Sequence, residues 1–199
     1  MHNQPSLSSP AHIVIDDKFC SIKSTTFTVW KKSLIFNGKG FTVFDSAGNL
    51  AFRVDNYASN AKSEILLMDD VGNVLITLLR KRWNLHRRWD GFRGDTVQRE
   101  KPIFTVTKSS FFSNKIRANV FLDFARQIKR CDYQMEGWSC KSSCTIFSAS
   151  RDIIAQFKQK EAKSDLMLGN DVFTLLVQPQ VDQAFIMGLI QFMRQLSCL

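Results

Sequence analysis

Short apolar runs separated by turn residues fill most of the sequence, and this pattern limits the chain to a mainly β fold. The runs are rich in Phe, Val, Ile and Thr, which suit the pleated surface of a sheet. Clusters of Gly, Asn and Asp lie between them and are typical of tight turns. About twelve strands at such spacing predict a sandwich or a barrel. The predicted strands are His12–Ile15, Thr25–Lys31, Phe41–Phe44, Leu50–Val54, Ile65–Met68, Val74–Leu79, Ile103–Thr107, Asn119–Leu122, Tyr133–Glu136, Thr145–Phe147, Asp152–Lys158 and Val172–Gln178.

Two of the turns share one pattern, in which Asp45-Ser-Ala-Gly-Asn recurs later in the chain as Asp69-Asp-Val-Gly-Asn. Each copy stands between two apolar strands, as in consecutive hairpins of a meander. A calcium loop would need several further oxygen ligands, including a closing carboxylate. The apolar residues that follow each turn supply none, so the pattern predicts hairpin turns and not calcium sites.

The C-terminal segment from Val181 to Leu196 shows no strand alternation and predicts a helix over about 180–196, beginning just after Pro179. Its apolar side chains cover about half of a helical wheel, and such a wide apolar surface indicates a mostly buried helix. A membrane span is the alternative, but it needs about 20 predominantly apolar residues. The polar residues that interrupt the segment and favour a core helix are Asp182, Gln183, Gln191, Arg194 and Gln195.

Strands and helix together predict a closed antiparallel β-barrel of about twelve strands around a central hydrophobic C-terminal α-helix. A barrel of that width is too wide for its own inward side chains to fill. The helix would fill the interior, and the 17 Phe residues would pack between the helix and the sheet.

The length of 199 residues fits one domain. We expect a disordered N-terminal tail over residues 1–10 and a single domain over 11–199. The N-terminus lacks the basic and apolar regions of a secretory signal. The five cysteines, an odd number, favour reduced thiols in the cytoplasm or nucleus. Cys140 and Cys144 form the one close pair and have no histidine beside them, so zinc is disfavoured.

The net charge of +9 favours anionic partners such as phospholipid surfaces, phosphorylated ligands or nucleic acid. The most basic stretch is Arg80–Arg93. Read as one extended strand, it places polar side chains on one face and Trp83, Leu85 and Trp89 on the other. Arginines on a rigid strand suit phosphate oxygens, and we expect weak, salt-sensitive binding to anionic lipid. The candidate lipid-binding residues are Arg80, Arg82, His86, Arg88 and Arg93.

Other interpretations of this basic stretch stay open. A solvated strand face that keeps the protein soluble would carry the same charges. If Asn84 marks a turn, the row breaks into two shorter patches. Nucleic-acid binding is less favoured, because the alternation places the tryptophans away from the basic face and single-stranded nucleic acid is bound through exposed aromatic side chains.

Known catalytic patterns are absent from the sequence. It has three histidines, no G-x-S-x-G elbow, no P-loop and no G-x-G-x-x-G after a predicted strand. We therefore expect a protein that is not an enzyme and that uses neither a metal nor a cofactor. It would act as a binding or scaffold module.

Several strings closely resemble the plant LURP-one-related family. They are Phe27–Asp45 (FTVWKKSLIFNGKGFTVFD), Phe52–Tyr57, Leu67–Asp69, Gly72–Leu75, Trp83–Gly91, Asp171–Phe173 and Asp182–Met187. Their order and spacing extend the resemblance over about residues 12–197. The resemblance implies a tubby-like barrel around a hydrophobic helix, distantly related to phospholipid scramblases.

The resemblance supplies no catalytic residue and no lipid-binding residue. It associates the chain with plant defence signalling and suggests a phosphoinositide-binding protein in the cytoplasm, at the plasma membrane or in the nucleus. A protein-interaction module with incidental charge and a membrane-tethered transcription regulator are the alternatives.

Overall fold

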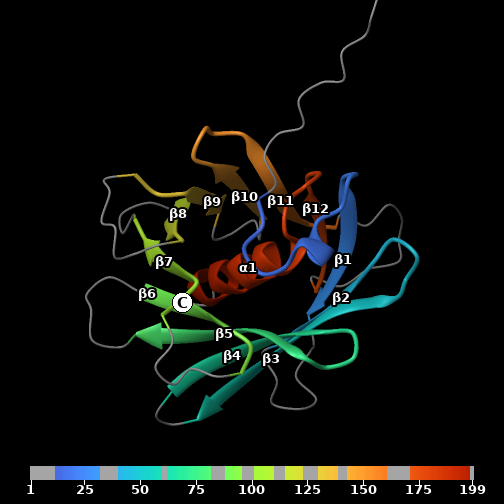
Figure 1. The fold of residues 1–199 in the computed structure, drawn as a ribbon, viewed down its shortest axis with the longest axis horizontal. Helices are drawn as coiled ribbons and strands as arrows, with labels where there is room; N and C mark the ends of the chain where they lie inside the picture. Colours follow the sequence, from blue (N-terminus) through green and yellow to red (C-terminus); the bar gives the residue numbers. More distant parts are fainter. Residues whose placement is uncertain are drawn as a thin grey trace, which may run out of the picture.

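The computed structural model describes residues 12–31, 40–59, 62–81, 88–95, 101–109, 115–122, 130–138, 143–160 and 171–197. They form a twelve-stranded barrel with one helix, α1, running through its interior (Figure 1). The elements are β1 (Thr25–Lys31), β2 (Phe41–Phe44), β3 (Leu50–Ser59), β4 (Lys62–Asp69), β5 (Val74–Lys81), β6 (Arg88–Arg93), β7 (Phe104–Lys108), β8 (Lys115–Phe121), β9 (Tyr133–Trp138), β10 (Ser143–Ser148), β11 (Ile153–Gln159), β12 (Val172–Val177) and α1 (Gln183–Ser197). A short 3₁₀ turn, η1 (Asp17–Phe19), precedes β1.

Each strand pairs antiparallel with the next strand in the chain, and β1 pairs with β12 to close the barrel. Thr25 of β1 lies opposite Val177 of β12, so residues from both ends of the domain share one ladder. The predicted antiparallel barrel around a C-terminal helix is confirmed. The predicted tail over residues 1–10 lies outside the described residues.

One predicted strand is absent and one observed strand was not predicted, so the number of strands is still twelve. His12–Ile15 is not a strand, because only a single bridge joins His12 to Val181. Strand β6, Arg88–Arg93, was not predicted as a separate strand, because its sequence mixes charged residues with Gly91. The remaining predictions correspond to the other strands, and those for β1 and β2 have the observed bounds.

The interior is filled by aromatic contacts between the sheet and α1. Phe104 of β7 packs edge-on against Phe185, and Trp89 of β6 packs edge-on against Phe192. At Gly91 a Cβ atom would lie 2.4 Å from the Phe104 ring, so only glycine allows that ring to sit there. The predicted role of phenylalanine between barrel and helix is confirmed at these positions.

Helix α1 begins at Gln183, a few residues later than predicted, because Asp182 caps it. One carboxylate oxygen of Asp182 accepts a hydrogen bond from Phe185 N at 3.0 Å. The other oxygen accepts from the backbone N–H groups of Val14, Ile15 and Asp16, the Ile15 bond being 2.6 Å long. A single buried carboxylate thus joins the helix start to the segment that precedes β1.

The repeated turns are hairpin turns, as predicted. Asp45 N bonds to Asn49 O, and Gly48 N bonds back to Asp45 O. Gly48 and Gly72 both have a positive φ, 87° and 97°. The Asp45 carboxylate accepts hydrogen bonds from Ala47 N, Asn49 N and the Asn49 side chain, so its oxygens are occupied by the turn itself.

A third turn has the same backbone bonds but no glycine. Ser148 N bonds to Asp152 O, and Arg151 N bonds to Ser148 O. Arg151 occupies the position of Gly48 and Gly72 with a φ of 73°. The sequence did not reveal this copy, because the residues Ser-Ala-Ser-Arg-Asp lack the glycine signature.

Candidate anion-binding end of the barrel

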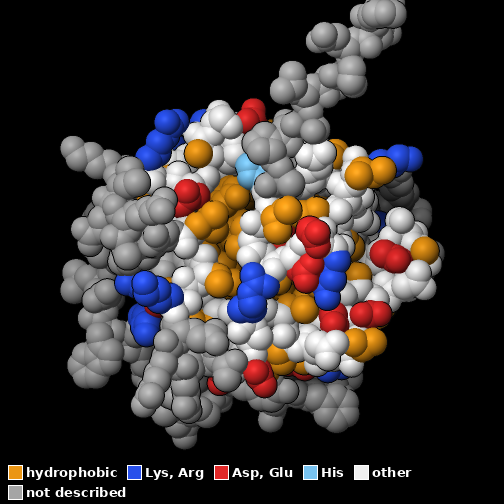
Figure 2. Space-filling model, viewed as in Figure 1, with side chains coloured by type: hydrophobic (Ala, Val, Ile, Leu, Met, Phe, Trp, Pro, Cys, Tyr) orange, Lys and Arg blue, Asp and Glu red, His pale blue; other side chains and the backbone are white. Residues whose placement is uncertain are grey.

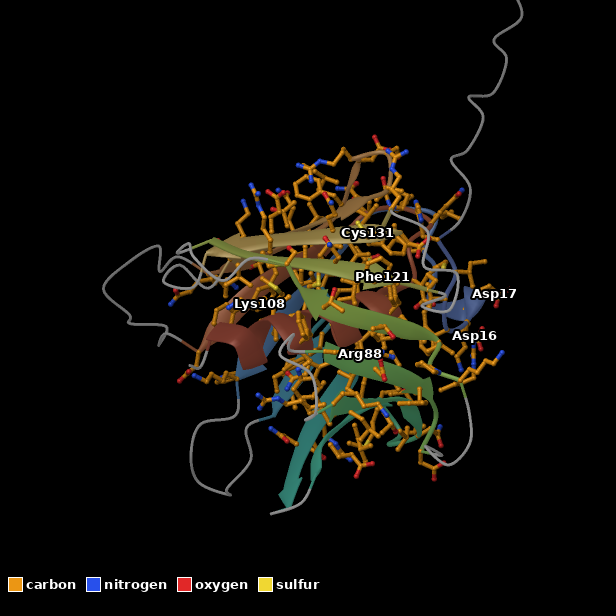
Figure 3. All side chains as sticks on the ribbon, turned by 90° about the vertical axis from the view of Figure 1, so that its left-hand side faces the viewer. Asp16, Asp17, Arg88, Lys108, Phe121 and Cys131 are labelled. Carbon is orange, nitrogen blue, oxygen red and sulfur yellow. The ribbon has the colours of Figure 1, made fainter. Side chains whose placement is uncertain are left out.

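The two ends of the barrel differ in their residues. We call the end where α1 begins the proximal end and the end where α1 finishes the distal end. In an antiparallel meander successive connections alternate between the ends, so β5 finishes and β6 starts at the distal end. Figure 3 shows Lys108 toward one end of the barrel and Asp16 and Asp17 at the other.

The basic stretch Arg80–Arg93 is not one strand. Strand β5 finishes at Lys81, β6 starts at Arg88, and these two residues lie opposite each other in an antiparallel pair. The prediction of a single extended row was therefore wrong, because the row is divided between two strands. Asn84, at which the sequence offered a turn, lies outside the described residues. Arg82 and His86, two of the candidate lipid-binding residues, lie outside the described residues.

The described cations of β5 and β6 lie on two faces of the sheet. Arg80 is opposite Trp89, and opposed residues of an antiparallel pair share a face. Because Trp89 contacts Phe192 of α1, Arg80 belongs to the inward-facing positions, at the distal mouth of the barrel. Lys81 and Arg88 form the next pair and face outward.

Arg88 is bound to a buried acid. Its Nε lies 2.8 Å from Asp90 Oδ1 and its Nη2 lies 3.2 Å from Asp90 Oδ2. Thr105 Oγ1 donates to the same carboxylate at 2.8 Å, and Lys81 Nζ lies 4.0 Å away. Asp90 is only 1% exposed. The charge of Arg88 is therefore largely engaged within the barrel wall.

Arg93 is at the opposite end of β6 from Arg88. Its guanidinium donates to the backbone carbonyls of Val14 and Ile15, the residues whose N–H groups bind Asp182. Arg93 thus holds the segment before β1 in place at the proximal end. The structure does not bring it together with Arg80.

The distal end gathers other cations that the sequence did not connect to Arg80. They come from the ends of β1, β7 and β11, because the meander returns these strand ends to one place. Lys31 lies 3.7 Å from Asp171, so acids are present there too. The described cations of this end are Lys31, Arg80, Lys81, Arg88, Lys108, Arg117 near the start of β8, Lys158 and Lys160.

The proximal end carries many acidic residues. Figure 2, which views the molecule as in Figure 1, shows red and blue side chains interspersed on the face toward the viewer. The described acids at this end are Asp16, Asp17, Asp45, Asp69, Asp70, Asp95, Asp132 and Asp152, and the cations are Lys18, Lys23, Arg93, Lys101, Arg130 and Arg151. The proximal end is thus mixed in charge, with a small excess of acids, and the distal end has an excess of cations. Combining the predicted meander with the alternation of its turns would have revealed this difference.

A pocket of about 480 Å³ lies at the proximal end between the turns that follow β8 and β10. His12 Nδ1 lies 3.2 Å from the Tyr133 hydroxyl at its wall. Burial raises the pKa of Tyr133 to about 12 and lowers the pKa of His12, so both are neutral at neutral pH. Arg130 and Asp132 at the rim have opposite charges. This pocket therefore offers little attraction to an anion.

Two observations in the part of the chain that the structure describes concern metal ions and thiols. Those residues contain no group of three or more His, Cys, Asp or Glu side chains placed to hold a metal ion. Burial raises the pKa of Cys144 to about 12, which keeps this thiol protonated and unreactive. Its predicted neighbour Cys140 lies outside the described residues. No helix among the described residues is long and apolar enough to cross a membrane.

Comparison with known proteins decides the family. The LURP-one-related family model matches residues 25–193, which span every strand and nearly all of α1. The chain belongs to the LURP-one-related family. The resemblance seen in the sequence is therefore confirmed over the whole barrel.

Known LURP-one-related proteins match almost end to end. LURP-one-related 5 of Arabidopsis thaliana is 40% identical over 191 residues, covering 92% of this chain and 89% of its own length. LURP-one-related 12 of the same plant is 37% identical, covering 93% and 84%. An X-ray structure of an Arabidopsis thaliana protein matches with a TM-score of 0.69 at 26% identity, covering 92% of this chain and 98% of that one.

Proposed function

We propose that this LURP-one-related protein is a non-enzymatic binding module whose distal barrel end docks on anionic phospholipid. The observation that carries the proposal is the position of Arg80 and Lys81 at the end of β5 and of Lys108 at the end of β7, because both strands finish at the distal end. The other end is mixed in charge, with a small excess of acids. Such a difference orients the molecule on a negatively charged surface.

Docking of this kind is weak and reversible. Each basic residue near an anionic membrane contributes about 1 kcal/mol, and the attraction falls off within a Debye length. Three such residues give peripheral association that weakens as the ionic strength increases. The protein would then act at the cytoplasmic surface of a membrane without spanning it.

Vesicle flotation tests the proposal. We expect the wild type to float with vesicles containing phosphatidylserine in low salt and to be released in high salt. The triple variant Arg80→Ala, Lys81→Ala and Lys108→Ala should bind about a hundredfold more weakly, from about 1 kcal/mol for each charge removed.

The matched control removes the same charge at the proximal end through Lys23→Ala, Lys101→Ala and Arg130→Ala. This variant should float nearly as well as the wild type. Equal loss in both variants would show attraction by net charge alone and would refute distal docking. Failure of the wild type to float would favour a protein-interaction module, and salt-sensitive DNA binding lost in the distal variant would favour a nucleic-acid partner.

A further inference from the structure

The proximal pocket, the cavity of about 480 Å³ between the turns that follow β8 and β10, takes no part in the proposed docking. Its volume falls within the range of about 300–1,000 Å³ that is usual for small-molecule sites. One wall includes Leu122, Arg130 and Asp132, and a second wall is formed by residues 148–150. His12, from the segment before β1, also lines the pocket. Three separate parts of the chain therefore meet around one cavity.

Arg130 and Asp132 are the charged residues of the described lining, and main-chain hydrogen bonds hold both side chains in place. Arg130 Nη2 donates to the carbonyl oxygen of Ala149 at 3.1 Å, so this side chain connects the two walls. Asp132 Oδ2 accepts from Leu122 N at 2.8 Å. Each charged group is thus fixed by the backbone and not by a side chain of opposite charge.

The two opposite charges do not neutralise each other. No ion pair joins Arg130 to Asp132, although both are described and both line one pocket. Asp132 Oδ1 and the remaining N–H groups of the Arg130 guanidinium have no hydrogen-bond partner among the described residues. A guanidinium and a carboxylate that face one cavity in this way can each form a charge-assisted hydrogen bond with a ligand.

The other polar groups of the pocket are neutral or already bonded. His12 is neutral at neutral pH, because burial lowers its pKa, and its Nδ1 lies 3.2 Å from the Tyr133 hydroxyl. The hydroxyl oxygens of Ser148 and Ser150 lie 2.8 Å apart, and both serines bond to the carboxylate of Asp152. Within the described lining, a ligand therefore meets one cation and one carboxylate that are still available.

A separated cation and carboxylate suit a ligand that carries a carboxylate and an ammonium group of its own. Asp132 would repel a simple anion, and Arg130 would repel a simple cation. Cα atoms two residues apart are at most about 7 Å apart, so the two ligand charges must be close together. A free α-amino acid carries both groups on one carbon atom. Its carboxylate matches the guanidinium fork, and its ammonium group donates to a carboxylate.

We propose that the proximal pocket binds a free α-amino acid, whose carboxylate contacts Arg130 and whose ammonium group contacts Asp132. An aliphatic side chain is expected on the ligand, because Leu122 and Ala149 are the aliphatic residues of the described lining. This inference goes beyond the proposed function and does not depend on it. The docking cations lie at the distal end, and this pocket lies at the proximal end.

Calorimetric titration with leucine tests the site without any membrane. We expect one leucine for each chain. Isocaproate, which is leucine without its ammonium group, and isopentylamine, which is leucine without its carboxylate, should each bind at least about tenfold more weakly. Glycine should also bind more weakly than leucine, because it has no apolar side chain to bury.

Substitution of each charged residue should change the preference between ligands. Asp132→Asn removes the charge and keeps an oxygen that can accept from Leu122 N. This variant should bind leucine at least about tenfold more weakly and should lose most of its preference for leucine over isocaproate. Arg130→Gln should lose the preference for leucine over isopentylamine instead. A general loss of structure would weaken all ligands alike, so a changed preference is specific to the site.

The matched control removes the same two charges elsewhere at the proximal end. The double variant Lys23→Gln and Asp70→Asn takes away one cation and one acid that do not line the pocket. It should change leucine binding by less than about twofold, as expected for exposed charges. The double variant Arg130→Gln and Asp132→Asn has the same net charge and should lose leucine binding. Thermal unfolding without ligand should be similar for the two double variants.

Three results would overturn the amino-acid site. They are no binding of leucine or of any other standard amino acid, equal binding of leucine and isocaproate by the wild type, and equal losses in the pocket and control variants. Flotation with phosphatidylserine vesicles should be unchanged in the pocket double variant, because the distal cations are intact. Failure of the amino-acid site and failure of distal docking are therefore distinguishable.

Discussion

Arg151 has a positive φ in its hairpin turn, at the position that glycine occupies in the two other turns of this pattern. Its guanidinium donates to Gln134 Oε1 at 2.6 Å and to Glu136 Oε1 at 3.2 Å, and it covers the Phe147 ring at 4.4 Å. These contacts offset the cost of a positive φ, which is about 1 kcal/mol for a residue with a Cβ atom. The side chain explains why arginine can stand in this turn.

Substitution at this position separates the two effects. Arg151→Ala loses the side-chain contacts and keeps the strained backbone, whereas Arg151→Gly loses the same contacts and relieves the strain. We expect the glycine variant to be more stable than the alanine variant by about 1 kcal/mol in urea unfolding. Equal stability of the two variants would show that the turn is unstrained.

Tyr133 provides a prediction about pH at the same scale. Burial is the main cause that raises its folded pKa to about 12, from an ordinary value of 10. Because the folded pKa is the higher one, the stabilising contribution is complete below pH 10 and is lost as the pH rises toward 12. Spectrophotometric titration should show one tyrosine that ionises near pH 12 in the folded protein, and Tyr133→Phe should remove that step and reduce the alkaline loss of stability. A folded wild type whose tyrosines all ionise near pH 10 would contradict the burial of this hydroxyl.

Strand β6 shows the limit of prediction at the level of the element. Its alternation correctly places Trp89 inward, because the period of two applies to any strand. The sequence could not show that Asp90 is buried and bound by Arg88 and Thr105, since nothing in a run of charged residues distinguishes a solvated face from a neutralised one. Two residues of one predicted basic row therefore have different roles, Arg88 in the wall and Arg80 at the mouth.

Arg88 and Arg80 can be distinguished by stability. Arg88→Ala leaves the buried Asp90 carboxylate without its main partner and should cost about 2 kcal/mol or more of unfolding free energy, since Lys81 and Thr105 compensate only in part. Arg80→Ala removes an exposed side chain and should cost less than about 0.5 kcal/mol. Denaturant unfolding of both variants checks this. Similar stability for the two would place Arg88 at the surface with Arg80.

The overall architecture, a barrel around a helix, was easier to predict from the sequence than any single strand or site. Strand alternation, turn residues and one broad apolar helix determine the barrel around α1, because each of them reflects burial. The proposed docking end was less predictable, because it depends on which strand ends meet. Arg80 and Lys108 come from β5 and β7, and the antiparallel pairing of both strands with β6 brings them to one end of the barrel.

The barrel depends on its helix, and a charge in the helix tests this. Leu189 is fully buried in α1, and Leu189→Asp places an unpaired carboxylate among apolar side chains. We expect this variant to lose cooperative folding, because burying a charge costs more than the few kcal/mol by which most domains are stable. Circular dichroism melting measures the effect, with Lys23→Asp as a surface control. A Leu189→Asp protein that melts cooperatively would contradict the central position of α1.

Closure of β1 against β12 also affects how the protein is made. A ribosome releases the chain from its N-terminus, so the strands emerge before the helix that their inward faces contact. The partner of β1 and then α1 leave the exit tunnel after all the other strands. Barrel closure must therefore wait until β12 has emerged, and until then the apolar faces of the early strands need shielding by chaperones or by transient collapse.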